Sequence, residues 1–385
     1  MDFTTTRSNL LHVIQTVYRV SSLKATLPIL GCILFKVSED NLTATSTDID
    51  LTIQCIIPVN VLKTGAACLP ARQITDIARC LPDTVLRIEN NAEINSTKIS
   101  YDDSQLNIKG YPPEQFPALP EVTEYISLAV TQGVFKEMIK QTVYAVSADK
   151  ARPLFTGVLF EKQDQKLRLV ATDTHRLAYR ETLVEDDLPA SPARFAVGGQ
   201  QAGAGQAYNI IVPGSALAEL NRIMRDPEEK VTIKISKNHA FFTTKDTLLI
   251  SRLIAGQFPA YRQIIPVNFS SCLVGNTEEL TSAVARASLL IDEEMPVLRL
   301  NLSPAESLIS VSTSSGWIKE KLRVNYQGEE MEIFFNARYL IDVLRVIPTE
   351  ETTINFTGPL SAVIIQPIGG DDYLSLLLPA RPKSD

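Results

Sequence analysis

Histidine, cysteine and tryptophan are scarce in this sequence. Its 385 residues include three histidines, five cysteines and one tryptophan. The cysteines are scattered and form no C-x-x-C pair, which argues against a zinc ribbon and favours a reducing compartment, so we expect a cytoplasmic protein. No window approaches ~18 uninterrupted apolar residues, which excludes a membrane-spanning helix. The amino terminus has an acid at position 2 and no long apolar core, unlike a signal peptide.

Acidic residues outnumber basic ones, so the formal net charge is −7. That sum alone argues against a nucleic-acid partner, but the distribution of charge matters more than the sum. With 45% hydrophobic and 21% charged residues, the composition is typical of a globular protein. The chain is too long for one ordinary core, so we expect two or three domains.

The sequence does contain an internal repeat. "TVYRVSS" (16–22) recurs as "TVYAVSA" (142–148), and "LTATSTDIDL" further on recurs as "LRLVATDTHRL". A weaker third copy ends in "LISVSTSSGWIKEKL" (308–322), and the second half of every copy reads strand, helix, strand. Agreement at so many ordered positions predicts homologous domains. We expect three of them, at residues 1–121, 126–266 and 267–385.

Within each half of a repeat, helical periodicity gives way to strand alternation. Leu10, Val13, Ile14 and Val17 form one apolar helix face, and "CILFKV" and "NLTATST" then alternate as strands. A helix followed by several short strands, repeated six times, predicts an α+β fold with two helices packed on antiparallel sheet in each domain. The glycine-rich segment 198–206 lacks the Gly-Lys-Ser/Thr ending of a phosphate-binding loop and is interpreted as a connector.

The six expected helices all carry positive charge on the face opposite their apolar residues. Any single surface helix needs a solvated face, and that explanation suffices for each helix alone. Repetition in all six, in a chain of net charge −7, favours a basic surface that binds a phosphate backbone without reading bases. No base-reading motif is visible. The residues of this surface are Arg19, Arg72, Arg79, Lys136, Lys140, Arg222, Arg225, Arg286, Arg338 and Arg345.

The stretch "VATDTHRLAY" (170–179) looks most like a reactive site, because His175 stands between Asp173 and Arg176. A hydrolase would use His175 as general base, yet no nucleophile elbow accompanies it. One histidine with one aspartate also supplies too few ligands for a metal. We therefore expect no catalytic residue, no metal site and no cofactor.

The repeat gives an internal control for this stretch. Asp48 occupies the place of Asp173 in the first copy, without a neighbouring histidine, and Ser314 occupies it in the third. A Thr-Asp pair at a strand end is typical of a turn in which the carboxylate accepts backbone N–H bonds. Asp173 is therefore interpreted as a turn residue.

Taken in order, several motifs resemble those of a known family. "TLPIL", "PARQITDIARCLP", "QFPALP", "VATDTHRLA", "ISRLIAGQFPAYRQIIP", "FNARYLIDVL" and "YLSLLLPARP" are similar to segments of the bacterial β sliding clamp of DNA polymerase III, over essentially the whole chain. The resemblance implies three DNA-clamp domains per chain and a homodimer closed head to tail as a ring. Double-stranded DNA would pass through the ring without sequence preference.

The resemblance also implies what the protein does. It predicts a processivity factor, a non-catalytic subunit of a DNA-directed DNA polymerase without 3'-5' exonuclease activity. Its partners would be the DNA polymerase III alpha subunit, the clamp loader and other proteins with a clamp-binding motif. The alternative is a repeat scaffold that binds proteins only and has no use for basic helix faces.

In the family a pocket between the second and third domains receives short peptides from these partners. Here Thr174 stands where the family usually has glycine, Gln263 replaces a frequently basic position, and the chain continues as "PARPKSD". These departures bear on partner preference. Carried over by motif, the pocket residues are Phe155, Thr172, Thr174, His175, Arg176, Leu177, Pro259, Gln263, Ile264, Met295, Asn336, Tyr339, Leu360, Ala362, Leu376, Leu377, Leu378, Pro379, Ala380 and Arg381.

Two further sets of residues follow from the resemblance. Ring closure in the family pairs edge strands of the first and third domains around a small apolar patch. Ordinary core packing is the alternative for the leucines of that patch. The matching positions are Leu106 and Ile108 on one side and Leu289 and Leu290 on the other, and the implied DNA contacts are Lys24, Arg72, Arg79 and Lys150.

Overall fold

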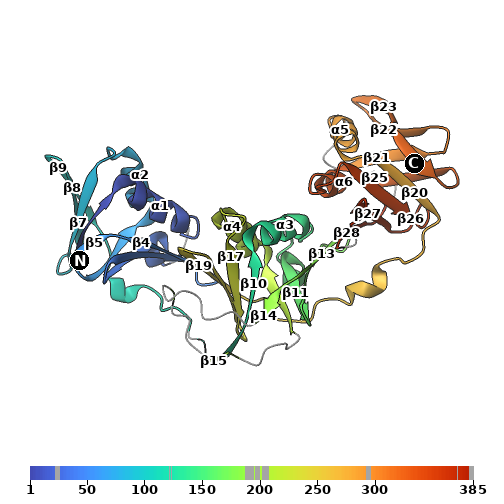
Figure 1. The fold of residues 1–385 in the computed structure, drawn as a ribbon. Helices are drawn as coiled ribbons and strands as arrows, with labels where there is room; N and C mark the ends of the chain where they lie inside the picture. The colour runs from blue at the N-terminus through green and yellow to red at the C-terminus, as the bar shows by residue number, and fades with distance from the viewer. Residues whose placement is uncertain are drawn as a thin grey trace. The chain divides into compact units, whose positions relative to one another are not determined.

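The fold divides into two compact units (Figure 1). A computed structural model describes residues 1–21, 27–120, 122, 124–186, 195, 200–201, 208–291, 296–370 and 372–380. None of the helices within these ranges is long and apolar enough to cross a membrane. Unit 1 contains Met1–Gly133, Glu185–Ala204 and Arg222–Leu253, whereas unit 2 contains Val134–Val184, Gly205–Asn221 and Ile254–Asp385.

Each half of each repeat forms one α-helix, as the periodicity predicts. Three of the helices begin at a side-chain cap, because Thr6, Asn276 and Asn336 each accept a hydrogen bond from a backbone N–H of the first turn. Helix α1 packs on α2, and α5 packs on α6. The helices are α1 (Arg7–Tyr18), α2 (Ala71–Cys80), α3 (Gln132–Val143), α4 (Gly214–Ile223), α5 (Thr277–Ser288) and α6 (Ala337–Leu344).

Unit 1 contains two sheets. The smaller one has the strand order β5 (Asn60–Lys63), β1 (Asp2–Thr6), β7 (Val85–Asn91), β8 (Ser96–Tyr101) and β9 (Ser104–Lys109). The larger one has the order β14 (Glu185–Asp186), β10 (Glu124–Thr131), β17 (Lys230–Ile235), β18 (His239–Thr243), β19 (Thr247–Arg252), β4 (Leu51–Pro58), β3 (Asn41–Thr47), β2 (Cys32–Ser38) and β6 (Gly65–Pro70). Strand β15 (Gln200–Gln201) pairs with β10 in parallel.

Unit 2 also contains two sheets. The larger one has the order β16 (Tyr208–Pro213), β11 (Gly157–Gln163), β12 (Lys166–Thr172), β13 (Arg176–Leu183), β28 (Tyr373–Leu377), β27 (Val363–Pro367), β26 (Glu351–Phe356), β20 (Ser271–Asn276) and β24 (Val324–Gln327). The smaller one has the order β23 (Gly316–Leu322), β22 (Ser307–Thr313), β21 (Val297–Leu302) and β25 (Met331–Asn336). Short 3-10 helices are η1 (Pro28–Gly31), η2 (Pro113–Gln115), η3 (Pro153–Thr156) and η4 (Tyr261–Ile264).

Both large sheets continue across the junction of two repeats. In unit 1, β19 pairs antiparallel with β4, with Thr247 opposite Cys55. In unit 2, β13 pairs antiparallel with β28, with Leu177 opposite Leu376. Backbone ladders of this kind satisfy strand edges that each repeat would otherwise leave open. The connector predicted at 198–206 lies mostly outside the described residues.

A four-residue turn closes the hairpin of the first two repeats in the same way. Asp48 Oδ1 accepts the backbone N–H groups two and three residues ahead of it at 3.1 and 2.7 Å, and Asp173 Oδ1 does so at 2.9 and 3.0 Å. The hydroxyls of Thr47 and Thr172 accept a further backbone N–H at 3.0 and 3.1 Å. The predicted strand-end turn is therefore confirmed. The third repeat differs, because only two residues separate the paired Thr313 and Gly316.

Both four-residue turns hold a β-branched residue in the left-handed region of backbone space. Ile49 has φ of 85° and Thr174 has φ of 82°. Side chains branched at Cβ are strained there, whereas glycine adopts such angles freely. The third repeat places Ser315 at the same position without a positive φ. Thr174 therefore occupies a site whose backbone geometry favours glycine.

Replacing either strained residue by glycine tests this reading of the turn. We expect Thr174→Gly and Ile49→Gly each to raise the free energy of unfolding by about 0.5–1 kcal/mol, because the relieved strain exceeds the backbone entropy that glycine adds to the unfolded chain. Urea unfolding followed by circular dichroism measures the change. Ser315→Gly is the matched control and should lower stability. Equal destabilisation of all three variants would contradict the interpretation that Ile49 and Thr174 are strained.

Candidate functional site

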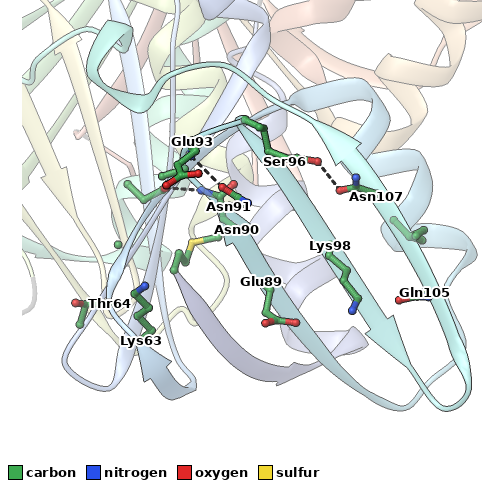
Figure 2. A pocket seen from close by; sticks show the side chains of 16 residues that line it. Lys63, Thr64, Glu89, Asn90, Asn91, Glu93, Ser96, Lys98, Gln105 and Asn107 are labelled. Atoms are coloured by element: carbon green, nitrogen blue, oxygen red, sulfur yellow. Dashed lines mark hydrogen bonds between the residues drawn. The ribbon is translucent and has the colours of Figure 1, made fainter.

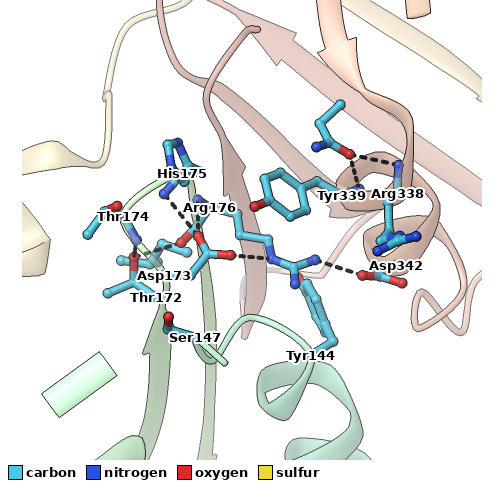
Figure 3. Close-up of polar contacts among 12 residues, drawn as sticks. Tyr144, Ser147, Thr172, Asp173, Thr174, His175, Arg176, Arg338, Tyr339 and Asp342 are labelled. Atoms are coloured by element: carbon cyan, nitrogen blue, oxygen red, sulfur yellow. Dashed lines mark hydrogen bonds and ion pairs between the residues drawn. The ribbon is translucent and has the colours of Figure 1, made fainter. Parts of the chain in front are cut away.

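The guanidinium of Arg176 is the buried charge at the centre of the candidate site (Figure 3). Its Nε donates to Asp173 Oδ2 at 3.0 Å, and its NH1 donates to Asp342 Oδ2 at 2.8 Å. The guanidinium also lies 4.3 Å from the ring centroid of Tyr339 and 5.3 Å from that of Tyr144. Two carboxylates and two aromatic faces thus replace the water around this cation. Arg176 thereby joins β13 to helices α3 and α6.

His175 lies beside this cluster without forming a catalytic pair. Its ring stacks on Tyr339 with the centroids 6.2 Å apart and the planes 25° apart. Both carboxylate oxygens of Asp173 are occupied by backbone N–H groups and by Arg176, so the carboxylate does not orient the imidazole as a triad requires. An exposed imidazole on an aromatic ring is suited to contact with a ligand.

The carboxyl-terminal strand brings further predicted residues to the same place. Strand β28 pairs with β13 so that Arg176 is opposite Leu377, and the backbone N–H of Leu378 donates to the carbonyl oxygen of His175 at 2.9 Å. Leu177 and Leu376 are buried in one apolar cluster, against which Ala362 packs. The side chain of Leu378 is 41% exposed at the end of this strand. An exposed apolar side chain, Leu378, thus follows directly after buried apolar residues of the strand.

Helix α6 supplies the aromatic wall. Asn336 caps this helix by accepting the backbone N–H groups of Arg338 and Tyr339 at 2.9 and 3.2 Å. The cap fixes the first turn and so places the Tyr339 ring over Arg176. Burial raises the pKa of Tyr339, and the charge of Asp173 adds to that shift, so the ring remains a neutral phenol.

Other predicted pocket residues have different surroundings. Phe155 lies in η3, with the guanidinium of Arg152 5.6 Å from its ring centroid. Pro259 and Gln263 line a groove of about 550 Å³ beside strands β11 and β16. Ile264 is 54% exposed and Leu360 is 77% exposed. The tail residues Pro379 and Ala380 are half-buried, and Ala380 donates its N–H to a carbonyl of β25; Met295 and Arg381 lie outside the described residues.

A network of charges supports the turn that carries Pro259 and Gln263. The guanidinium of Arg168 donates to Glu161 at 2.8 Å and to Glu181 at 3.0 Å, and Tyr261 donates to Glu161 at 3.2 Å. Burial alone would raise the pKa of Glu181, but hydrogen bonds from Lys166, Tyr179 and Arg168 outweigh it and lower the pKa to about 2. Glu181 therefore stays ionised and holds this network together.

The sequence did not predict two half-buried partners of Arg176, Tyr144 and Asp342. Tyr144 donates its hydroxyl to Ser375 at 2.8 Å, which ties α3 to β28. Asp342 lies on α6 and is 30% exposed at its side chain. Tyr144 matches Tyr18 in the aligned "TVYRVSS" and "TVYAVSA" stretches, so the repeat held a signal for it. No local sequence pattern indicated that Asp342 contacts Arg176.

The predicted DNA contacts are largely exposed cations. Arg72 and Arg79 lie on α2, where Asp76 is 3.9 and 3.8 Å from them. Lys140, Lys150 and Arg222 are exposed, Lys136 is half-buried, and Lys24 lies outside the described residues.

One basic residue, Arg225, was wrongly placed on a helix, and another, Arg286, lies on its expected helix but pairs with a carboxylate. Helix α4 ends at Ile223, so Arg225 lies beyond its face and instead places NH1 3.0 Å from His12 Nδ1. Arg286 is neutralised by Glu320 of β23, with Nε 3.0 Å from Oε2. The carboxylate that pairs with Arg286 lies on a strand and not on the helix, which a pattern within one helix does not reveal.

One pair of predicted dimer residues lies on an edge strand, and the other follows the end of helix α5. Leu106 is half-buried on the edge strand β9, and Ile108 on the same strand is only 4% exposed, in the core of its own sheet. Leu289 is 82% exposed at the end of α5, whereas Leu290 packs against the apolar core of the carboxyl-terminal repeat. Leu106 and Leu289 are thus the side chains that a partner can reach.

A larger groove in unit 1 is chemically different (Figure 2). It measures about 1020 Å³ and its walls include Lys63, Glu89 and Lys98, with several amide side chains. Ser96 donates to Asn107 at 2.7 Å within it. A wall of charges and amides offers few apolar anchors, so the Arg176 cluster is the better candidate for peptide recognition.

Removing the charge of Arg176 tests its structural role. We expect Arg176→Met to lower the free energy of unfolding of unit 2 by about 3 kcal/mol, because Asp173 and Asp342 would keep their charges without a partner. Urea unfolding followed by circular dichroism measures this loss. The double variant with Asp342→Asn should recover part of it, and Arg345→Met, at the exposed residue that directly follows α6, is the control. Equal stability of Arg176→Met and the unaltered chain would contradict this role.

Comparison with known proteins places this geometry in a family. Models of the DNA polymerase III beta subunit match along the chain: the N-terminal domain at residues 1–120, the central domain at 129–260 and the C-terminal domain at 262–381. Beta sliding clamps of Staphylococcus epidermidis and Staphylococcus aureus are each 32% identical over 393 residues, covering 99% of both chains.

Solved structures agree with the family models. The DNA polymerase sliding clamp of Bacillus subtilis is 31% identical with a TM-score of 0.91, over 99% of each chain. The sliding clamp of Pseudomonas aeruginosa, solved bound to griselimycin, is 27% identical with a TM-score of 0.89, over 99% of this chain and 100% of that one. The predicted α+β fold with three clamp domains is thereby confirmed. This chain belongs to the family of the bacterial DNA polymerase III beta subunit, the β sliding clamp.

Proposed function

We propose that two copies of this chain close head to tail into a ring, that duplex DNA passes through the ring, and that the chain tethers replication and repair proteins to the DNA without doing chemistry itself. Membership of the sliding clamp family along the whole chain carries this proposal. A topological grip needs only weak phosphate contacts, because strong ones would arrest sliding. We assign this activity to the cytoplasm.

Open strand edges support the proposed ring closure. Strand β9 ends the small sheet of unit 1, and β23 ends the small sheet of unit 2. An edge strand presents unpaired N–H and C=O groups that another chain can extend as an antiparallel ladder. In the proposed dimer, Leu106 and Leu289 bury their exposed surface at this contact, while Ile108 and Leu290 support them from the cores.

The proposed DNA contacts are sequence-independent. Arg72, Arg79 and Lys150 are exposed cations, and Lys24 joins them by motif. Each phosphate neutralised by such a side chain releases counterions, so binding weakens as salt rises. None of these side chains belongs to a base-reading motif, which fits a protein that must move along any sequence. Lys136, Lys140, Arg222 and Arg225 complete the proposed set.

The Arg176 cluster is the proposed peptide site. Leu177 and Leu376 form a buried floor, while His175 and Leu378 stand exposed at its rim. Short peptides bind such sites by burying a few apolar anchors, which supply most of the energy. The proposed partners are the DNA polymerase III alpha subunit, the clamp loader and other proteins with a clamp-binding motif. A clamp solved bound to griselimycin is consistent with ligand capture by this fold.

Topological binding has a direct test on DNA. We expect the chain, loaded by its own clamp loader onto a nicked circular plasmid, to co-elute with the plasmid in gel filtration and to be lost when one cut makes the plasmid linear. The double variant Arg72→Ala, Arg79→Ala should load several-fold less, because two phosphate contacts are gone. Lys36→Ala, at an exposed lysine of β2, is the matched control. Retention on linear DNA would instead favour a groove binder, and no retention would favour the protein-only scaffold.

Peptide capture is tested at the rim of the site. We expect His175→Ala and Leu378→Ala each to weaken binding of a fluorescein-labelled peptide from the clamp-binding segment of the replicative polymerase by about tenfold, equal to ~1.4 kcal/mol. Fluorescence anisotropy measures the affinity, and gel filtration should show an unchanged dimer. Leu183→Ala is the control, because Leu183 is 69% exposed at the end of β13 that lies far from His175. If both variants bound the peptide with unchanged affinity, the peptide would have to bind elsewhere on the chain.

A further inference from the structure

A second cluster of reactive side chains lies in unit 1, away from the peptide site. It joins His12 of α1, Cys55 of β4 and Asp246, which directly precedes β19, and one donor atom from each lies within 4.8 Å of the other two. His12 Nε2 is 3.1 Å from Asp246 Oδ2, although 234 positions separate the two residues in the chain. The sequence predicted no metal site, because its cysteines are scattered and Asp173 with His175 supplies too few ligands, and this cluster joins residues that are far apart in the chain.

The donor set suits a borderline divalent cation. A thiolate, an imidazole and a carboxylate are the ligands of Zn²⁺ sites, and around one tetrahedral ion such donor atoms lie about 3 to 4 Å apart. The Nε2–Oδ2 distance of 3.1 Å is already at that separation. Thr247 donates its hydroxyl to Asp246 Oδ1 at 2.8 Å, which leaves Oδ2 directed at His12.

The thiol of Cys55 is buried and protonated in this state. Burial raises its pKa to about 12, and the charge of Asp246 contributes to the shift. A coordinated ion would displace the thiol proton, as metal sites do, so that binding releases protons. Cys55 is fully enclosed by the fold, and water therefore competes little for this ligand.

When no ion is bound, Arg225 provides a hydrogen-bond donor for His12. Its NH1 lies 3.0 Å from His12 Nδ1, and a guanidinium only donates, so Nδ1 accepts and the Nε2–H donates to Asp246. Ligation through Nε2 would move the imidazole proton to Nδ1, where it would face the guanidinium. Arg225 is exposed and free to turn toward solvent. It therefore competes with the ion for His12.

We propose that His12, Cys55 and Asp246 form a site for one Zn²⁺-class cation, with water as the fourth ligand and Arg225 as its competitor. The ion would fasten α1 and β4, which belong to the amino-terminal family segment, to the β18–β19 turn of the central one. The site would thus lock the junction across which β4 and β19 pair.

Metal titration of the full-length chain, stripped with a chelator, tests the site. We expect one equivalent of Zn²⁺ per chain in competition with a chromophoric chelator, and a thiolate-to-metal charge-transfer band when Co²⁺ replaces it. Cys55→Ser should abolish the band and lower affinity at least tenfold, and His12→Gln and Asp246→Asn should lower affinity similarly. Cys80→Ser, at an exposed cysteine, is the matched control.

The competing role of Arg225 makes a prediction of opposite sign. Arg225→Gln should bind Zn²⁺ several-fold more tightly than the unaltered chain, because the histidine gains a neighbour that can accept its Nδ1–H. Circular dichroism confirms folding of each variant. Absence of a charge-transfer band in the unaltered chain, or the same band in Cys55→Ser, would overturn the site. Neither DNA nor a partner peptide is present, so the outcome is independent of the proposed clamp function.

Discussion

A desolvated cation, Arg176, lies at the junction of two repeats in unit 2. Arg176 brings together a turn of the central repeat and a helix of the carboxyl-terminal repeat, because only their two carboxylates and two aromatic rings replace its lost water. Strands β13 and β28 pair at the same junction of two repeats. The exposed His175 and Leu378 lie beside this pairing, and the backbone N–H of Leu378 donates to the carbonyl oxygen of His175. The proposed peptide site thus lies on the contact between two repeats of one unit, so its shape depends on that junction.

Repetition explains why the same turn has two uses. In the first repeat, Thr47 and Asp48 close a hairpin and do nothing more that their contacts reveal. In the second, the identical hydrogen bonds leave the second oxygen of Asp173 to hold Arg176. The second repeat has Arg176 where the first repeat has Leu51, and this difference gives Asp173 its additional contact. The positive φ of Ile49 and of Thr174 shows that the two turns share one backbone conformation at this position.

The two junctions are built from different chemistry. In unit 2 the guanidinium of Arg176 donates to the carboxylates of Asp173 and Asp342. In unit 1 the pairing of β4 with β19 is accompanied by a histidine, a thiol and a carboxylate. Those groups exchange protons and accept metals. One junction thus contains an arginine between two acids, and the other contains the three groups of the proposed cation site.

The sequence alone determined the repeat, the α+β class, the helices and the turn at Asp173, because each follows from local periodicity or from hydrogen bonds between neighbours in the chain. The resemblance of motifs then indicated the family. Only the tertiary structure decided that Asp342 and Tyr144 enclose Arg176, that Glu320 neutralises Arg286, and that His12, Cys55 and Asp246 meet. These contacts join residues that are distant in sequence, and no local pattern encodes a distance between them. Both large sheets continue across repeat junctions for the same reason. The strands that pair there are distant in sequence, and their pairing is set by packing in space.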